Sequence, residues 1–229
     1  MTMPTRVIEV ARDHLLDRGL LEFSLRALAR DLGMTAPALY RYFPSRTALL
    51  EAIAERSFDL LDARLMEALA GSGPHDRLAR AAHGYLRFGL DHPRDFALLA
   101  LLPGAFGSLP LSEGLRAREA ATFQFWTDRV REAMEAGVLV AGPPEEVAAA
   151  LRSMAHGLIS LHLRGTLEAG DRPAFEALFW ASGIRLMEGL AGPRWNRAAL
   201  PEVVVDAIRA ADAVPPADRE EGSEEGSKV

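Results

Sequence analysis

The run from Ser24 to Phe43 constrains the fold more than any other part of the chain, because it predicts two short helices joined by a tight turn. Ser24 is placed to cap the first helix by accepting a backbone N–H of its first turn. Gly33 then follows the helix directly, as suits a residue that can adopt the left-handed conformation of a helix end. The apolar residues between them recur at helical spacing and form one face: Leu25, Leu28, Ala29 and Leu32.

The second short helix begins after Thr35, which can act as its cap. Pro37 falls in the first turn, where a missing N–H costs little. Leu39 and Phe43 are expected to face inward, and the outward side chains are Thr35, Ala36, Ala38, Tyr40 and Arg41. Pro44 ends this helix, and Ser45 caps a third helix that starts with Arg46. The layout predicts a helix-turn-helix, whose exposed second helix can enter the major groove of DNA.

The stretch 39–50, Leu-Tyr-Arg-Tyr-Phe-Pro-Ser-Arg-Thr-Ala-Leu-Leu, resembles the end of the DNA-binding domain of TetR-type transcriptional regulators. The similarity extends back through Phe23-Ser24-Leu25-Arg26 to an opening helix at about Pro4–Arg18, and so covers roughly the first 55 residues. Members of this family bind DNA as dimers, so the resemblance implies double-stranded operator DNA and a second copy of the chain as partners.

The resemblance also implies individual DNA contacts. Arg26 matches a family position that can read guanine. The guanidinium group of an arginine can donate two hydrogen bonds, to O6 and N7 of that base. Tyr40, Tyr42 and Arg46 match positions that bind phosphate, and Arg41 points outward toward bases or backbone. Small side chains at the start of the second helix can contact thymine methyl groups: Thr35, Ala36, Pro37 and Ala38. Alternatively, Tyr42 is partly core, and Arg26 pairs with Glu22 or Asp31.

Composition narrows the class of protein. The 229 residues, 49% of them hydrophobic, can bury a sizeable core, and the absence of cysteine excludes disulfides, thiolate catalysis and Cys-ligated zinc. The sequence shows neither a secretion signal at its N-terminus nor a run of 18 apolar residues, so we expect a cytoplasmic protein with no membrane partner.

The net charge of −6 does not by itself indicate nucleic-acid binding, but the charges are unevenly placed. Residues 24–50 hold four arginines against a single aspartate, whereas residues 201–229 hold eight acids against three basic residues. Phosphate contacts supply much of the affinity for DNA, so a few arginines predict modest non-specific binding and a need for dimerisation.

Helical signals continue along the rest of the chain, and alternating strand patterns are absent. We therefore expect an all-α protein, with a three-helix head over 1–50, an antiparallel helical body over 51–212 and a disordered acidic tail over 213–229. The helices expected in the body are 46–69, 76–91, 93–102, 112–136, 143–166 and 171–190, with a short one over 203–213.

The helix over 171–190 is apolar on more than one face, as suits a helix with both core and partner contacts. In the family, the last two long helices of each body form an intersubunit four-helix bundle. The resemblance thus implies a dimer interface that includes Phe175, Leu178, Phe179, Gly183 and Leu186. The alternative is a fully buried core helix.

An effector pocket is expected in the body, where aromatic residues gather. The candidates for its lining are Tyr85, Phe88, Phe96, Phe106, Phe123, Trp126 and His156. The alternative is plain core, which aromatic residues at helical spacing more often form. The segment 154–161 resembles the His-Gly region of one TetR subgroup, although it lacks the tryptophan that often precedes it there. His156 and His162 do not share a helix face, which is poor spacing for a metal.

Enzyme motifs are absent. The sequence has no Glu-x-x-His pair for a di-iron site, no Gly-rich phosphate loop, no Gly-x-Ser-x-Gly and no His-Glu-x-x-His. We expect a dimeric transcriptional regulator without a cofactor or metal, acting as a repressor that a small, mainly apolar effector releases from a near-palindromic operator. The alternative is a DNA-binding regulator or activator that takes no small-molecule ligand.

Overall fold

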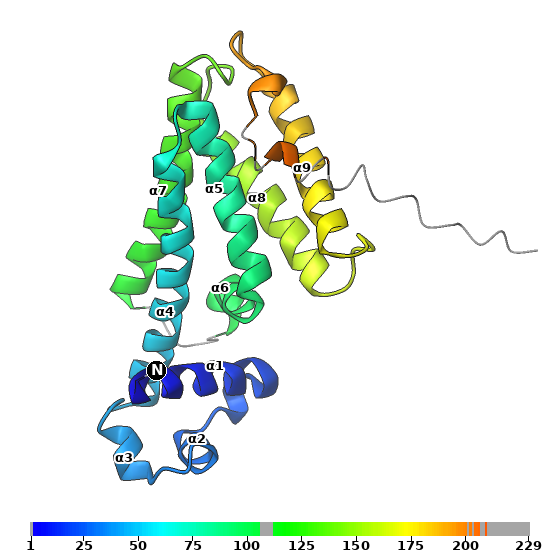
Figure 1. Cartoon of the computed structure of the whole chain (residues 1–229). Helices are drawn as coiled ribbons and strands as arrows, with labels where there is room; N and C mark the ends of the chain where they lie inside the picture. Colours follow the sequence, from blue (N-terminus) through cyan, green and yellow to red (C-terminus); the bar gives the residue numbers. More distant parts are fainter. Residues whose placement is uncertain (1, 106–111, 201, 203, 207–208, 210–229) are drawn as a thin grey trace, which may run out of the picture.

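The computed structural model describes residues 2–105, 112–200, 202, 204–206 and 209. Within these residues the chain is helical, and its only β-type pairing is an isolated bridge between Leu139 and Ala191. Figure 1 shows a small helical head at one end, joined to a larger bundle of roughly antiparallel helices. This confirms the expected all-α fold with a helix-turn-helix head and a helical body.

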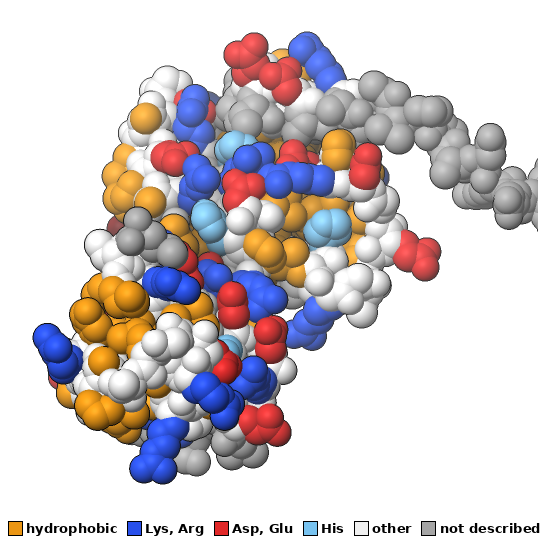
Figure 2. All heavy atoms as spheres, turned by 60° about the horizontal axis from the view of Figure 1, so that its bottom comes forward, with side chains coloured by type: hydrophobic (Ala, Val, Ile, Leu, Met, Phe, Trp, Pro, Cys, Tyr) orange, Lys and Arg blue, Asp and Glu red, His pale blue; other side chains and the backbone are white. Residues whose placement is uncertain are grey.

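The head consists of α1 (Met3–Glu22), α2 (Leu25–Asp31) and α3 (Ala36–Tyr40). Gly33 turns the chain between α2 and α3 with φ at +66°, a conformation that L side chains rarely adopt. Val7, Leu28, Leu39 and Leu49 are fully buried and hold the head together. Figure 2 turns the head toward the viewer: basic side chains are spread over the head, and the acidic ones visible on it lie mostly on its right-hand side.

Helix α4 (Arg46–Met66) connects the head to the body (Figure 1). Ser45 caps it by accepting from Ala48 N at 3.0 Å, and a short 3₁₀ helix (Glu67–Ala70) continues it. Its buried face runs from Leu49 in the head to Leu65 in the body. Because α4 crosses residue 50, the head and the body share one continuous helix, and the expected division at that residue falls inside it.

The body is built from α5 (Pro74–Asp91), α6 (Pro93–Ala105), α7 (Glu113–Glu135), α8 (Pro144–Leu163) and α9 (Arg172–Gly189), followed by a 3₁₀ turn (Arg197–Ala199). Gly84 lets α5 approach α4 closely, because a Cβ there would lie 2.5 Å from the Arg64 carbonyl oxygen. Helix α9 lies at the outside of the bundle beside α8 (Figure 1).

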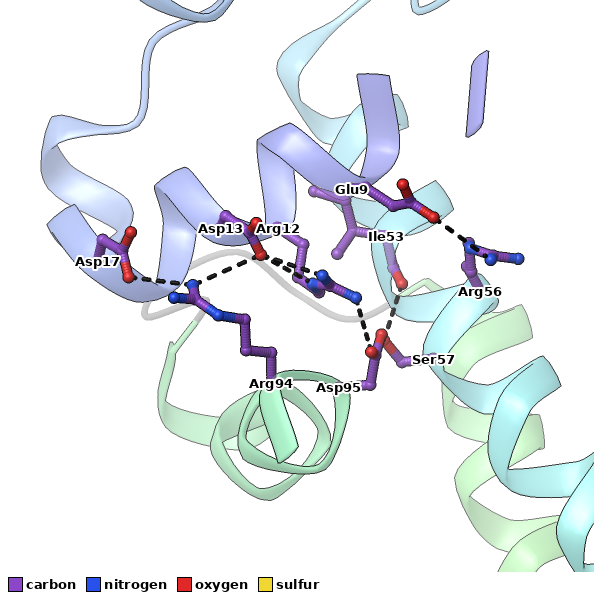
Figure 3. A network of polar contacts seen from close by, with 9 residues as sticks. All are labelled: Glu9, Arg12, Asp13, Asp17, Ile53, Arg56, Ser57, Arg94 and Asp95. Atoms are coloured by element: carbon purple, nitrogen blue, oxygen red, sulfur yellow. Dashed lines mark hydrogen bonds and ion pairs between the residues drawn. The ribbon is translucent and has the colours of Figure 1, made fainter. Parts of the chain in front are cut away.

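A network of polar contacts joins the head to the body (Figure 3). The Asp95 carboxylate on α6, only 3% exposed, accepts a hydrogen bond from Arg12 Nη1 on α1 at 2.7 Å. Ser57 Oγ on α4 lies 2.7 Å from the other carboxylate oxygen. Arg94 reaches Asp17 of α1 at 3.1 Å on the exposed side of the same contact. Asp95 thus connects three helices, and we call this contact the Asp95 junction.

Most of the expected helices lie within a few residues of their observed bounds. One capping expectation is wrong: Ser24 stands at the N-cap position of α2, but its side chain makes no capping hydrogen bond. Of the helix expected at 203–213, residues 204–206 and 209 are helical. The other positions in that range, and the expected tail at 213–229, lie outside the described residues.

The Asp95 junction predicts a large effect of Asp95→Ala on stability. The change leaves a mostly buried guanidinium without its best partner, so the free energy of unfolding should fall by about 3 kcal/mol. Urea unfolding followed by circular dichroism, at one protein concentration, measures this. The matched control is Asp17→Ala, because that side chain is 60% exposed and its ion pair should be worth less than about 1 kcal/mol. Equal losses for the two variants would contradict the role given to Asp95.

Candidate nucleic-acid interface and ligand cavity

Helix α3 stands at the end of the head farthest from the body (Figure 1). Thr35 caps it by accepting from Ala38 N at 3.4 Å, and Pro37 lies in its first turn. Leu39 and Phe43 are buried as expected, so the inner face of α3 is fixed to the head. The short helix is therefore held rigidly while its other face is left to solvent.

The side chains expected to contact DNA lie on that outer surface. Tyr40 and Tyr42 are 46% and 45% exposed, so Tyr42 is not a core residue. Arg26, Thr35, Pro37 and Arg41 are also exposed, and Ala36, Ala38 and Arg46 are partly exposed. All nine expected contact residues can thus be reached from solvent.

A shallow hollow brings three of these residues together from different helices. Arg26 of α2, Tyr40 of α3 and Arg46 of α4 line it, together with Phe23, Ser24, Leu25, Pro44 and Ser45. The first turns of α2 and α4 both border the hollow. Two arginines, the phenol of Tyr40 and two helix N-termini therefore converge on one concave surface. Free N–H groups at helix N-termini attract anions, so this surface is suited to bind a phosphate.

The charges around the hollow favour an anion. Within the described part of the chain, Arg26 and Arg41 have no carboxylate partner, so the alternative pairing of Arg26 with Glu22 or Asp31 does not form. Asp31 instead lies 3.1 Å from His14 and 3.5 Å from both Arg18 and Arg30. Asp31, the single acidic residue of the segment 24–50, is thus paired with basic side chains other than Arg26 and Arg41.

Arg46 is oriented by a contact that the sequence reasoning did not include. Its guanidinium carbon lies 5.8 Å from the centroid of the Phe23 ring, within cation–π range. Phe23 is itself buried in the head. A phenylalanine one residue before the α2 cap was visible in the sequence, but its position beneath Arg46 depends on the packing of three helices.

The body contains a cavity that unites four of the expected effector-pocket residues. Tyr85, Phe88, Phe96 and His156 line it together, and we call it the Tyr85–His156 cavity. Its remaining lining residues are Phe58, Leu61, Leu99, Ala100, Glu119, Thr122 and Arg152. Phe123 contacts Arg152 from outside this lining, Trp126 borders a separate cavity, and Phe106 lies outside the described residues.

Three polar groups of this cavity have defined states. Tyr85 Oη lies 2.9 Å from His156 Nδ1, and the His156 ring stacks on Phe96 with centroids 5.0 Å apart. Burial lowers the pKa of His156, with Arg152 and Arg164 adding to the effect, so the imidazole is neutral at pH 7. Burial raises the pKa of Tyr85 to about 12. Arg152 has no carboxylate within ion-pair distance in the described residues, so the cavity offers a cation to a ligand.

The residues expected at a dimer interface divide into two groups. Phe175 and Phe179 are fully buried inside one chain, and Phe175 stacks against His162 with ring centroids 3.8 Å apart. These two are core residues, which corrects the expectation for them. Leu178 is 37% exposed, while Gly183 and Leu186 are partly exposed. Leu161 and Leu163 at the end of α8 are exposed too, and the sequence reasoning did not select them.

No group of three metal-ligating side chains comes together within the described residues. In the same part of the chain, none of the helices combines the length and apolar character that crossing a membrane requires.

Known protein families match both the head and the body of this chain. Residues 7–53 match a family model described as bacterial regulatory proteins, tetR family, and residues 78–187 match one described as tetracyclin repressor-like, C-terminal domain. The HTH-type transcriptional regulator Rv1816 of Mycobacterium tuberculosis is 32% identical over 126 residues. That match covers 52% of this chain and 53% of Rv1816, so the chain spans about half the length of the curated relatives it matches.

Solved structures with the same fold include a protein of unknown function from Rhodococcus sp. RHA1, 28% identical with a TM-score of 0.68. That match covers 83% of this chain and 96% of the other. The ketosteroid transcriptional regulator KstR2 of M. tuberculosis is 17% identical with a TM-score of 0.68, covering 83% and 95%. AibR, in complex with isovaleryl coenzyme A and operator DNA, is 17% identical with a TM-score of 0.61, covering 81% and 94%.

Proposed function

Because this chain belongs to the TetR family of DNA-binding transcriptional regulators, we propose that it is a homodimeric repressor released from its operator by a small, mainly apolar effector. The observation that carries the DNA-binding part is the hollow in which Arg26, Tyr40 and Arg46 meet. The division into a head over 1–50, a body over 51–212 and a tail over 213–229 belongs to the same proposal.

In this proposal the N-terminal half of α3 enters the major groove. Thr35, Ala36, Pro37 and Ala38 are small enough to lie against base edges and thymine methyl groups. Tyr40, Tyr42 and Arg46 bind phosphates, and the first turn of α4 adds backbone N–H groups directed at the same anion. Arg26 reads a guanine, and Arg41 reaches either bases or backbone. Neither Arg26 nor Arg41 forms an ion pair with any residue that the structure describes, which supports these roles because no such pair has to break first.

The dimer is proposed to form through α8 and α9, with Leu161, Leu163 and Leu178 as exposed apolar contacts. Gly183 and Leu186 lie on the same helix as Leu178. Leu186 is proposed to extend this surface, whereas Gly183 faces Met154 of α8, since a Cβ there would lie 3.5 Å from that side chain. Two heads would then enter successive major grooves of a near-palindromic operator, with the recognition helices roughly 34–36 Å apart.

The effector is proposed to bind in the Tyr85–His156 cavity. Its wall is mainly aromatic and aliphatic, and Arg152 supplies the cation, so an apolar molecule with one acidic or acceptor group fits best. Helix α6 supports a link to the head, because Asp95 holds Arg12 while the next residue, Phe96, lines the cavity. A ligand that moves α6 would change the orientation of the head, provided that it binds the two states with different affinity.

DNA binding predicts distinct effects for Arg26 and Tyr40. A duplex is first recovered from a random-sequence pool by repeated selection with the full chain, and fluorescence anisotropy then measures affinity. Arg26→Ala should reduce discrimination at one base pair by about 1–3 kcal/mol, because a bidentate contact to guanine is lost. Tyr40→Phe should weaken binding to all duplexes about threefold to tenfold, because one phosphate contact is lost.

Arg80→Ala is the matched control for these variants, because Arg80 lies on the body and pairs with Asp76 at 2.9 Å. It should leave the affinity for the selected duplex within experimental error. Unchanged affinity and specificity in both head variants, or an equal loss in the control, would contradict the proposed interface.

Effector release is tested with straight-chain carboxylates from hexanoate to dodecanoate. A carboxylate that binds the Tyr85–His156 cavity should raise the melting temperature and lower the affinity for the selected duplex. Arg152→Met, which keeps an unbranched apolar stem but removes the guanidinium group, should abolish both responses, while Arg80→Met should keep them. Stabilisation without any change in DNA affinity would instead favour a regulator or activator that no ligand controls.

A further inference from the structure

An open cleft lies where the end of α1 in the head meets the start of α6 and the end of α8 in the body. Its volume is about 430 Å³, and sites for small molecules typically measure about 300–1,000 Å³. We call it the head–body cleft, and the lining residues that matter below are Leu16, Asp17, Arg94, Ala97, Leu163 and Arg164. A molecule held in this cleft touches the head and the body at once.

The walls of the cleft can be reached from solvent. The charged side chains that line it, those of Asp17, Arg94 and Arg164, are exposed. Leu16 and Ala97, which form part of its apolar wall, are partly exposed. A ligand can therefore contact both hydrocarbon and charged groups from the open side of the cleft.

The charges in the cleft favour an anion. Arg94 and Arg164 supply two positive charges among its lining residues, against one negative charge from Asp17. Arg164 forms no ion pair and no side-chain hydrogen bond with any residue that the structure describes. Pairing with an anion would thus satisfy this guanidinium group without breaking an existing contact.

Arg94, by contrast, is already paired with the head. Figure 3 shows its side chain reaching from α6 to α1, where Nη1 lies 3.1 Å from Asp17 and 3.5 Å from Asp13. The side chains of Arg94 and Asp17 are 48% and 60% exposed, so this ion pair contributes little to stability. An anionic ligand competes with Asp17 for Arg94, and the Asp17 charge should therefore oppose its binding.

We propose that the head–body cleft binds an organic anion whose acidic group pairs with Arg94 and Arg164. The apolar part of this molecule packs against Leu16 and Ala97. The acidic group is a carboxylate, sulfonate or phosphate, because each of these accepts charge-assisted hydrogen bonds from guanidinium groups.

The head–body cleft is a separate site from the Tyr85–His156 cavity. Phe96 and Ala100 of α6 belong to both linings, but the cation of that cavity is Arg152. Leu163 lines the cleft and is also a proposed dimer contact, so the cleft adjoins the surface proposed for the partner. The inference does not depend on the proposed function, because neither DNA nor the proposed effector enters it.

The test uses anilinonaphthalene sulfonate, whose fluorescence rises when its rings leave water. Phenylnaphthylamine, which has the same rings without the sulfonate, is the matched probe. Fluorescence titration of the full chain measures both dissociation constants. Arg164→Gln should weaken binding of the sulfonate about tenfold, because a charged pair is lost, and leave phenylnaphthylamine unchanged. Asp17→Asn should tighten binding of the sulfonate about threefold, because Arg94 is released from its competitor.

Control variants locate the probe. Ala97→Leu narrows the apolar wall and should weaken both probes. Arg26→Gln is the matched control for Arg164→Gln, because Arg26 is also an exposed arginine without a carboxylate partner in the described residues. It should change neither dissociation constant, and nor should Arg152→Met in the other cavity.

Four results would overturn the proposal. The first is the absence of saturable binding of the sulfonate to the full chain, which would also follow if a partner covered the cleft. The second is unchanged affinity in both Arg164→Gln and Asp17→Asn, and the third is an equal loss in Arg26→Gln. The fourth is a loss confined to Arg152→Met, which would place the probe in the proposed effector cavity instead.

Discussion

The arrangement of the molecule depends on one nearly buried carboxylate. The Asp95 carboxylate accepts hydrogen bonds from Arg12 of α1 and Ser57 of α4. The first helix of the head, the connecting helix α4 and helix α6 of the body therefore meet at this one group. Removing a carboxylate from water is expensive unless charge and hydrogen bonds compensate it, and here a guanidinium and a hydroxyl do so. Such a contact is sensitive to geometry, which suits a joint that must hold the head in one orientation.

The sequence predicted the local features of the head well, because they depend on neighbouring residues. The turn at Gly33, the caps Thr35 and Ser45 and the inward Leu39 and Phe43 all follow from spacing. It could not predict the Asp95 junction, whose partners Arg12 and Asp95 are 83 positions apart. Nor could the sequence distinguish the buried face of α9 from its exposed face, because apolar residues occur all around this helix. Phe175 and Phe179 proved to lie on the buried face.

The body holds two cavities that differ in chemistry. The Tyr85–His156 cavity includes Arg152, Glu119 and a neutral histidine, and its wall shares α6 with the Asp95 junction. The other cavity lies between α5, α7, α8 and α9 and has an almost wholly apolar wall. Helix α9 also carries Leu178, which is exposed. One cavity is therefore placed beside the joint to the head, and the other beside the surface proposed to meet a second copy of the chain.

Amide hydrogen exchange of the full chain, with and without the selected duplex, tests most directly whether the surface of α2, α3 and the start of α4 binds DNA. The account predicts that DNA slows exchange in residues 24–48, where exposed amides border the hollow of Arg26, Tyr40 and Arg46. Exchange in α5, which lies in the body, should stay unchanged. Slowed exchange confined to the body, or none in the head at a DNA concentration that saturates binding, would contradict it.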